Sequence, residues 1–174
     1  MGRITPPERV MLFAGFLFND TSILEKSLEL LTKLYGDILF KSQQINWNYS
    51  EYYNNELGKN ILRQFVFFKN LIDPANIVDI KIQTNKFEEM FLDNNRRRIN
   101  IDPGYISLAK IVLATTKNYS HRIYLGRGIY AEVTLIYKNN TFIPFFYTYK
   151  DYRGKEYIDI FLKARNELKN ILKN

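Results

Sequence analysis

A histidine, a glutamate and a tyrosine in the C-terminal half of the chain are the residues best suited to chemistry. His121 is the only histidine, Glu132 lies inside an apolar run, and Tyr147 belongs to the segment that follows. A carboxylate next to an imidazole fixes its tautomer and favours its protonated form, an arrangement that suits general acid–base catalysis. A phenol beside them could donate a hydrogen bond to a phosphate or carbonyl oxygen. These three residues are the candidate catalytic residues.

Two predicted turns determine whether the three side chains meet. Gly126-Arg127 fits a two-residue type II′ turn, and Asn139-Asn140 fits a type I′ turn because asparagine tolerates positive φ. With these turns, His121 lies opposite Glu132, and Glu132 lies opposite Tyr147. Directly opposed residues share a face of a sheet, so the spacing predicts one row of polar groups across three adjacent strands.

Two alternatives compete with this catalytic row. A three-residue first turn would pair Arg122 with Glu132 and would remove His121 from the row. Alternatively, His121 and Glu132 form a structural cross-strand pair on a partly exposed sheet face, with Tyr147 packed beside them. In the predicted register the opposite face is apolar and belongs to the core; it consists of Ile129, Ala131, Val133 and Leu135.

Residues around this row could bind a ligand. Positive charges would neutralise an anion, hydroxyl groups would donate hydrogen bonds, and a carboxylate could lie at the rim. The candidate ligand-binding residues are Thr116, Lys117, Arg122, Arg127, Asp102 and Tyr130.

Three other segments are weaker candidates. Asn46–Tyr49, together with Tyr52 and Tyr53, could stack on a base, although packing is the alternative. Arg96-Arg97-Arg98 could bind phosphate, although a solvated surface run is the alternative. Asp102–Tyr105 has the composition of a turn.

Length and composition limit the possible classes of protein. The chain has 174 residues, 46% of them hydrophobic, which predicts one domain, residues 1–174, with a sizeable core. No segment reaches the roughly 20 apolar residues of a membrane span. The absence of cysteine fits a cytoplasmic protein, and a single histidine excludes a multi-histidine metal site. Asp102 and Glu132 could bind magnesium or could equally serve structure, and the sequence leaves any cofactor unknown. The net charge of +7 favours anionic partners such as nucleotides or RNA, or serves solubility alone.

Hydrophobic periodicity predicts the elements that position these residues. The first half reads strand, helix, strand, strand, helix, strand, the order of a ferredoxin-like core. Its strands are expected at Val10–Phe18, Ile38–Trp47, Leu62–Phe68 and Arg97–Ile101, and its helices begin at Asn19–Thr21 and at Asp73-Pro74. Ile106–Thr115 is either a strand or a short helix. An antiparallel meander and a C-terminal helix from about Lys155 follow, which predicts an α+β fold.

Several long segments are similar to a known bacterial family. The chain resembles the domain of unknown function numbered 4416 over Asn100–Tyr105, Leu113–Leu135 and Tyr149–Arg153, and also over Phe13–Phe18, Leu71–Pro74 and Ile80–Glu89. Members of that family are sometimes labelled GTP-binding proteins, so the resemblance implies nucleotide binding and supplies no catalytic residue. The chain lacks the G-x-x-x-x-G-K-[ST] phosphate loop, so a P-loop mechanism is not expected.

The first functional hypothesis is a domain that binds a nucleotide or another phosphate-bearing molecule and that could act on it with the His121, Glu132 and Tyr147 row. The second is RNA binding through a basic sheet face, although the aromatic signature of RNA-recognition motifs is absent. The third is an interaction module without catalysis, which would have no cleft beside the row.

Overall fold

The computed structural model describes residues 2–50 and 53–173. In this part of the chain, nine strands form one antiparallel sheet. The strands are β1 (Val10–Phe18), β2 (Ile38–Lys41), β3 (Ile45–Asn46), β4 (Leu62–Ile72), β5 (Ile99–Ile106), β6 (Lys110–Thr115), β7 (Ile123–Gly126), β8 (Ile129–Lys138) and β9 (Thr141–Pro144). The helices are α1 (Thr21–Tyr35), α2 (Asn54–Leu57), α3 (Ile77–Met90) and α4 (Lys155–Ile171), with single 3₁₀ turns η2 (Pro74–Asn76) and η3 (Asp151–Arg153). The predicted α+β class is confirmed.

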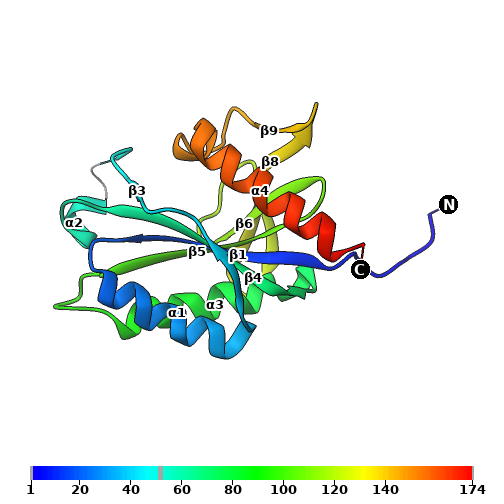
Figure 1. Cartoon of the computed structure of the whole chain (residues 1–174). Helices are drawn as coiled ribbons and strands as arrows, with labels where there is room; N and C mark the ends of the chain where they lie inside the picture. Colours follow the sequence, from blue (N-terminus) through cyan, green and yellow to red (C-terminus); the bar gives the residue numbers. More distant parts are fainter. Residues whose placement is uncertain (1, 51–52, 174) are drawn as a thin grey trace.

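The sheet lies between helices on both faces. Helices α1 and α3 cover one face, and α4 crosses the other (Figure 1). Strand β1 has the predicted bounds, and all nine of its residues are buried. Its side chains alternate, so that Leu12 and Phe16 belong to the core under α1 and α3, whereas Met11 and Phe13 belong to the core under α4. A strand covered on both faces needs an almost continuous apolar run, which explains the composition of β1.

Local sequence signals set the helix ends. Asp20 caps α1, because its Oδ1 accepts a hydrogen bond from the backbone N of Ser22 at 2.9 Å. Ser22 and Glu25 have the spacing of a capping box, but the N-cap is Asp20, two residues earlier. Gly36 ends the helix with φ of 88°, in the left-handed region that favours glycine. Asp73 caps η2 by accepting from the backbone N of Ala75, and η2 leads directly into α3.

The expected turn at Asp102–Tyr105 is wrong, because these residues continue β5 beside β1. Asp102 lies opposite Gly15, and Gly104 lies opposite Phe13. A Cβ atom on Gly104 would lie 2.5 Å from the Phe13 ring and 2.4 Å from the Val112 carbonyl oxygen. The missing side chain lets the strand pass through this narrow space, so packing against β1 and β6 overrides the turn propensity.

The strand order places the C-terminal strands differently from the prediction. The order is β2-β4-β1-β5-β6-β8-β7, with β3 paired to β4 and β9 paired to β8. The single strand predicted at Ile38–Trp47 is thus two short strands, both beside β4. Strand β6, in the segment that the sequence left ambiguous, occupies one side of β8. Consequently β7 and β9 share the other side of β8, at its two ends, and the three-strand meander predicted from the sequence is wrong.

Among the described residues, no helix combines the length and apolar character needed to cross a membrane.

Candidate functional site

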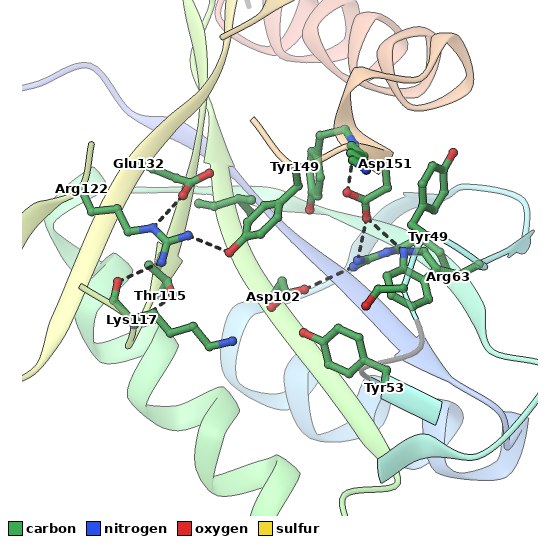
Figure 2. Close-up of a pocket in the computed structure, with 16 residues that line it drawn as sticks. Tyr49, Tyr53, Arg63, Asp102, Thr115, Lys117, Arg122, Glu132, Tyr149 and Asp151 are labelled. Atoms are coloured by element: carbon green, nitrogen blue, oxygen red, sulfur yellow. Dashed lines mark hydrogen bonds and ion pairs between the residues drawn. The ribbon is translucent and has the colours of Figure 1, made fainter. Parts of the chain in front are cut away.

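A pocket of about 370 Å³ opens on the sheet face that carries α4, beside the turn that leads into this helix (Figure 2). Strands β4, β5, β6 and β8 supply its floor. Its walls come from the segment after β3 and from the segment between β9 and α4. The lining residues are Trp47, Tyr49, Ser50, Tyr53, Arg63, Asp102, Leu113, Ala114, Thr115, Lys117, Arg122, Glu132, Tyr149, Lys150, Asp151 and Tyr152.

A buried arginine organises one end of the floor. Arg63 is 3% exposed, and its guanidinium donates to Asp151 Oδ2 at 3.2 Å and to Asp102 Oδ2 at 3.3 Å. The indole Nε1 of Trp47 donates to the same Asp151 oxygen at 3.1 Å. Burial alone would lower the pKa of Arg63, but Tyr152 and the Asp151 carboxylate outweigh burial and raise that pKa above its ordinary value. Arg63 therefore remains charged and holds three chain segments together.

A glycine makes room for this arginine. Gly15 lies opposite Asp102 and opposite Phe65. A Cβ atom at Gly15 would lie 3.0 Å from Nη1 of Arg63 and 3.0 Å from the Phe65 ring. A larger residue on β1 would thus displace the guanidinium from below the pocket.

The other end of the floor is organised by Arg122. Its Nε donates to Glu132 Oε2 at 2.8 Å, Nη1 donates to the Lys117 carbonyl at 3.0 Å, and Nη2 donates to the Tyr149 hydroxyl at 2.7 Å. Both Arg122 and Glu132 have almost fully buried side chains. Burial raises the pKa of Tyr149, against the opposing effect of Arg122. Arg122 thus holds the loop before β7, strand β8 and the pocket wall in one arrangement.

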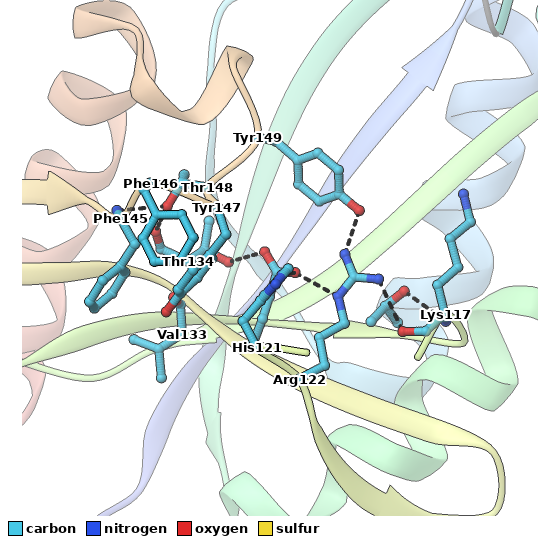
Figure 3. Close-up of polar contacts among 12 residues, drawn as sticks. Lys117, His121, Arg122, Val133, Thr134, Phe145, Phe146, Tyr147, Thr148 and Tyr149 are labelled. Atoms are coloured by element: carbon cyan, nitrogen blue, oxygen red, sulfur yellow. Dashed lines mark hydrogen bonds and ion pairs between the residues drawn. The ribbon is translucent and has the colours of Figure 1, made fainter. Parts of the chain in front are cut away.

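His121 and Tyr147 meet, but outside the lining of this pocket. The His121 Nε2 atom lies 3.2 Å from Glu132 Oε2, so the predicted contact is confirmed. The His121 and Tyr147 rings stack with centroids 4.2 Å apart, and the Tyr147 hydroxyl donates to the Val133 carbonyl (Figure 3). Burial and the nearby Glu132 carboxylate raise the pKa of Tyr147. Of the three candidate catalytic residues, Glu132 lines the pocket, whereas His121 and Tyr147 do not.

The predicted register of the first hairpin is wrong. Ile123 pairs with Ala131 and not with Tyr130, because positive φ falls on Arg127 and Gly128 as well as on Gly126, and a bulge follows at Leu125. This register brings Arg122 to Glu132, as the alternative with a longer turn requires. His121 keeps its contact with Glu132 because it precedes β7 and is not constrained by the strand ladder.

The second hairpin has the predicted turn but ends early. Asn139 and Asn140 have φ of 52° and 62°, and Lys138 pairs with Thr141. Strand β9 stops at Pro144, so Tyr147 is not in a strand, and it reaches His121 from a loop. The row predicted across three strands is therefore replaced by one strand residue, Glu132 of β8, and two loop residues, His121 and Tyr147.

The apolar face predicted for β8 is also wrong in part. The register between β6 and β8 shifts between Ile111 and Val112, so the alternation of β8 changes near Thr134. Ile129 packs in the core under α1 and α3, whereas Leu135 packs in the core under α4.

The structure divides the candidate ligand-binding residues. Asp102, Lys117 and Arg122 line the pocket, whereas Thr116 is exposed beyond the end of β6. Tyr130 pairs with Thr115 and packs its ring against Tyr124. Arg127, at the tip of the β7–β8 hairpin, forms an ion pair with Asp79 of α3. These three residues lie outside the pocket lining.

Sequence reasoning missed Arg63, Tyr149 and Asp151, whereas Thr115, expected with Thr116 as a hydroxyl donor, lines the pocket. Arg63 offered a signal, because it alternates with Phe65 and Phe67 and hence occupies a core-facing position of an apolar strand. Tyr149 and Asp151 offered no comparable signal. Trp47, Tyr49 and Tyr53 line the pocket, as base stacking would require, and Trp47 also packs in a small core with Leu17, Leu57 and Ile61. Tyr52 lies outside the described residues.

The arginine run serves ion pairs. Arg97 contacts Glu56 and Glu88 and donates to Asn100, and Arg98 pairs with Asp20. The Arg97 guanidinium also lies 5.9 Å from the centroid of the Tyr53 ring. The run is therefore not simply solvated at Arg97, which pairs with the buried Glu88, whereas Arg98 pairs with Asp20 at the surface; together they connect α2, α3 and the start of α1.

Among the described residues, no group of three or more histidine, aspartate or glutamate side chains is arranged to hold a metal ion.

Comparisons with known proteins agree with the sequence resemblance. No curated protein and no solved structure matches the chain. The sequence model of the family described as a domain of unknown function (DUF4416) matches residues 8–168, which include every strand and helix that forms the pocket. The chain therefore belongs to the DUF4416 family.

Proposed function

We propose that the pocket binds a small molecule that carries a phosphate group and a planar ring. Nucleotides are the class of ligand that combines these two features. The observation that carries the proposal is the combination of aromatic walls with a lysine inside one concave site. The aromatic walls are Trp47, Tyr49, Tyr53 and Tyr149, and Lys117 extends into the space between them (Figure 2). Aromatic rings stack on planar groups, and an ammonium group attracts phosphate.

The charges of the pocket support an anionic ligand. Arg63, Lys117, Arg122 and Lys150 carry four positive charges, whereas Asp102, Glu132 and Asp151 carry three negative charges. Arg63 and Arg122 are held by carboxylates, so they contribute mainly to shape. We assign the phosphate to Lys117, whose side chain extends into the pocket, and to Lys150, which also lines it.

The size of the site favours a small molecule over an RNA strand. A volume of about 370 Å³ lies within the range of ligand pockets. Two arginines of the basic run, Arg97 and Arg98, are engaged in ion pairs and not free to follow an RNA backbone. Neither point depends on catalysis by His121, so the proposal is one of binding.

Thermal unfolding and calorimetry with nucleoside mono-, di- and triphosphates, with and without magnesium, test the proposal. A ligand that binds the folded state increases the free energy of unfolding by mass action, by about 2.7 kcal/mol at a free concentration 100 times Kd. Tm rises as a result. We expect Lys117→Ala to weaken binding about 10-fold or more, because a charged hydrogen bond is lost. Lys138→Ala, on the exposed end of β8, is the matched control and should bind like the wild type. Unchanged binding by Lys117→Ala, or no nucleotide bound at millimolar concentration, would refute the proposal.

We also propose to class the first half of the chain as ferredoxin-like. Strands β2, β4, β1 and β5 are neighbours in this order and pair antiparallel, with α1 and α3 on one face. This is the arrangement expected of a split β-α-β-β-α-β unit. A solved structure of the chain that superposes on that fold over β1–β5 would test the assignment.

A further inference from the structure

We infer that Asp102 selects the ligand by accepting hydrogen bonds from sugar hydroxyl groups next to the phosphate, so that the pocket takes phosphorylated ribosides. This inference rests on the proposed function and adds a class of ligand and a specificity-determining residue.

Asp102 is rigidly placed and accessible. It lies in the middle of β5, where β1 flanks it, and Arg63 holds its Oδ2 at 3.3 Å. Its side chain is 29% exposed, whereas that of Asp151, the other partner of Arg63, is 8% exposed. Asp151 is surrounded by Arg63, Trp47 and the backbone N of Tyr152. Asp102 is therefore the carboxylate of this pair that can face a ligand.

One oxygen of Asp102 has hydrogen-bonding capacity left. Among the described residues, Oδ2 accepts from Arg63, and no hydrogen bond reaches Oδ1. Because Arg63 is buried and shared with Asp151, it cannot turn to satisfy both oxygens. A carboxylate is an acceptor only, so its partner in the ligand must be a donor. Hydroxyl, amine and amide groups meet this requirement.

The position of Lys117 narrows the choice of donor. Lys117 and Asp102 line the same pocket, and Figure 2 shows the lysine side chain extending toward the part where Asp102 and Tyr53 lie. A ligand that places its phosphate at Lys117 therefore presents to Asp102 the group next to that phosphate. In a nucleotide this group is the ribose, whereas the edge of the base is farther away. Carboxylates bind ribose hydroxyls in the same way in dinucleotide-binding folds.

The aromatic walls fit the remaining part of such a ligand. Tyr49 and Trp47 lie at the end of the pocket nearest Asp151, and their rings are 6.2 Å apart at a tilt of 54°. With the phosphate at Lys117 and the ribose at Asp102, the base is directed to these rings. The order phosphate, sugar, ring along the ligand thus matches the order lysine, carboxylate, aromatic wall along the pocket.

Ribose-deleted ligands test the inference without changing the protein. Calorimetry on the full chain compares the four ribonucleoside 5′-monophosphates with their 2′,3′-dideoxy counterparts. We expect the dideoxy compounds to bind about 10- to 100-fold more weakly, the usual effect of deleting hydrogen bonds to a charged group. Asp102→Asn should weaken the binding of the ribonucleotides by a similar factor and should leave the affinity for the dideoxy compounds nearly unchanged. Asp37→Asn, at an exposed position outside the pocket lining, is the control.

The outcomes separate this inference from the proposed function. Equal affinity of ribo and dideoxy monophosphates for the wild type would overturn the role of Asp102 and would leave the nucleotide pocket standing. A loss on dideoxy substitution that persists undiminished in Asp102→Asn would assign the hydroxyl contacts to another residue and would also overturn it. Binding of neither series would reject the proposed function, and this inference with it. If Asp102→Asn fails to fold, Asp102→Glu, which keeps the charge beside Arg63 and moves the carboxylate, takes its place in the same comparison.

Discussion

Replacing the buried Arg63 should destabilise the protein strongly. Arg63→Met removes the ion pairs to Asp151 and Asp102 and keeps much of the apolar volume of the side chain. Asp151 then remains as a buried carboxylate with Trp47 and the backbone N of Tyr152 as donors. Removing one partner of a buried pair costs about 3–5 kcal/mol, because the other charge stays desolvated.

The expected loss is large enough to measure in two ways. At about 2.1 cal/mol/K per residue, the unfolding entropy of a chain of this length is about 0.37 kcal/mol/K, so Tm should fall by about 8–14 °C. Chemical denaturation can be followed by fluorescence, because Trp47 is the only tryptophan and contacts Asp151. Arg127→Met makes the same substitution at an exposed ion pair and should cost less than about 1 kcal/mol.

A double-mutant cycle isolates the ion pair from the loss of packing. Asp151→Asn removes the charge and keeps a hydrogen-bond acceptor for Trp47. If the charge left behind causes the loss, Arg63→Met combined with Asp151→Asn should be more stable than the sum of the single effects by about 1 kcal/mol or more. A loss below about 1 kcal/mol for Arg63→Met, or strict additivity in the cycle, would show that Arg63 does not organise the pocket floor electrostatically.

Three further predictions follow from the contacts of the pocket and its surroundings. Gly15→Ala should cost about 1–3 kcal/mol and weaken ligand binding, since the new Cβ presses on Arg63; unchanged urea midpoints would contradict this. Glu132→Gln leaves Arg122 without its carboxylate and should cost about 3–5 kcal/mol, measured by urea unfolding, whereas a loss within about 0.5 kcal/mol would mean that this buried pair is dispensable. The contribution of the tyrosines to stability should be constant up to about pH 10, the ordinary tyrosine pKa, and should fall above it, because tyrosines whose pKa is raised in the folded state keep their protons there and lose them on unfolding. Tyrosinate absorbance of these residues should rise together with loss of structure, and ionisation well before unfolding would count against the burial argument. The tyrosines concerned are Tyr35, whose pKa burial raises to about 12, and Tyr53, Tyr105, Tyr147, Tyr149, Tyr152 and Tyr157.

The amino-acid sequence by itself determined the elements whose signals are local. The apolar run Val10–Phe18 requires burial on both faces, and it is the central strand β1. Asp73 and Pro74 mark the start of a helix, and Asn139-Asn140 accommodates positive φ and sets the register of β8 and β9. Each of these features depends on residues within a few positions of one another, so pattern and turn chemistry suffice. The contact between His121 and Glu132 was also predicted, although from a register that is wrong.

The tertiary structure decided which side chains share the pocket. Strand β6 occupies the side of β8 on which the sequence placed a hairpin partner, and this choice depends on pairing between strands and not on any turn. The pocket joins Arg63, Asp102 and Asp151, which are 39 to 88 residues apart in sequence. Gly15 on β1 makes room for the Arg63 guanidinium. Arg63 belongs to the pocket because the strand order brings Asp102 and the segment of Asp151 next to it. No local sequence pattern encodes the order of the strands.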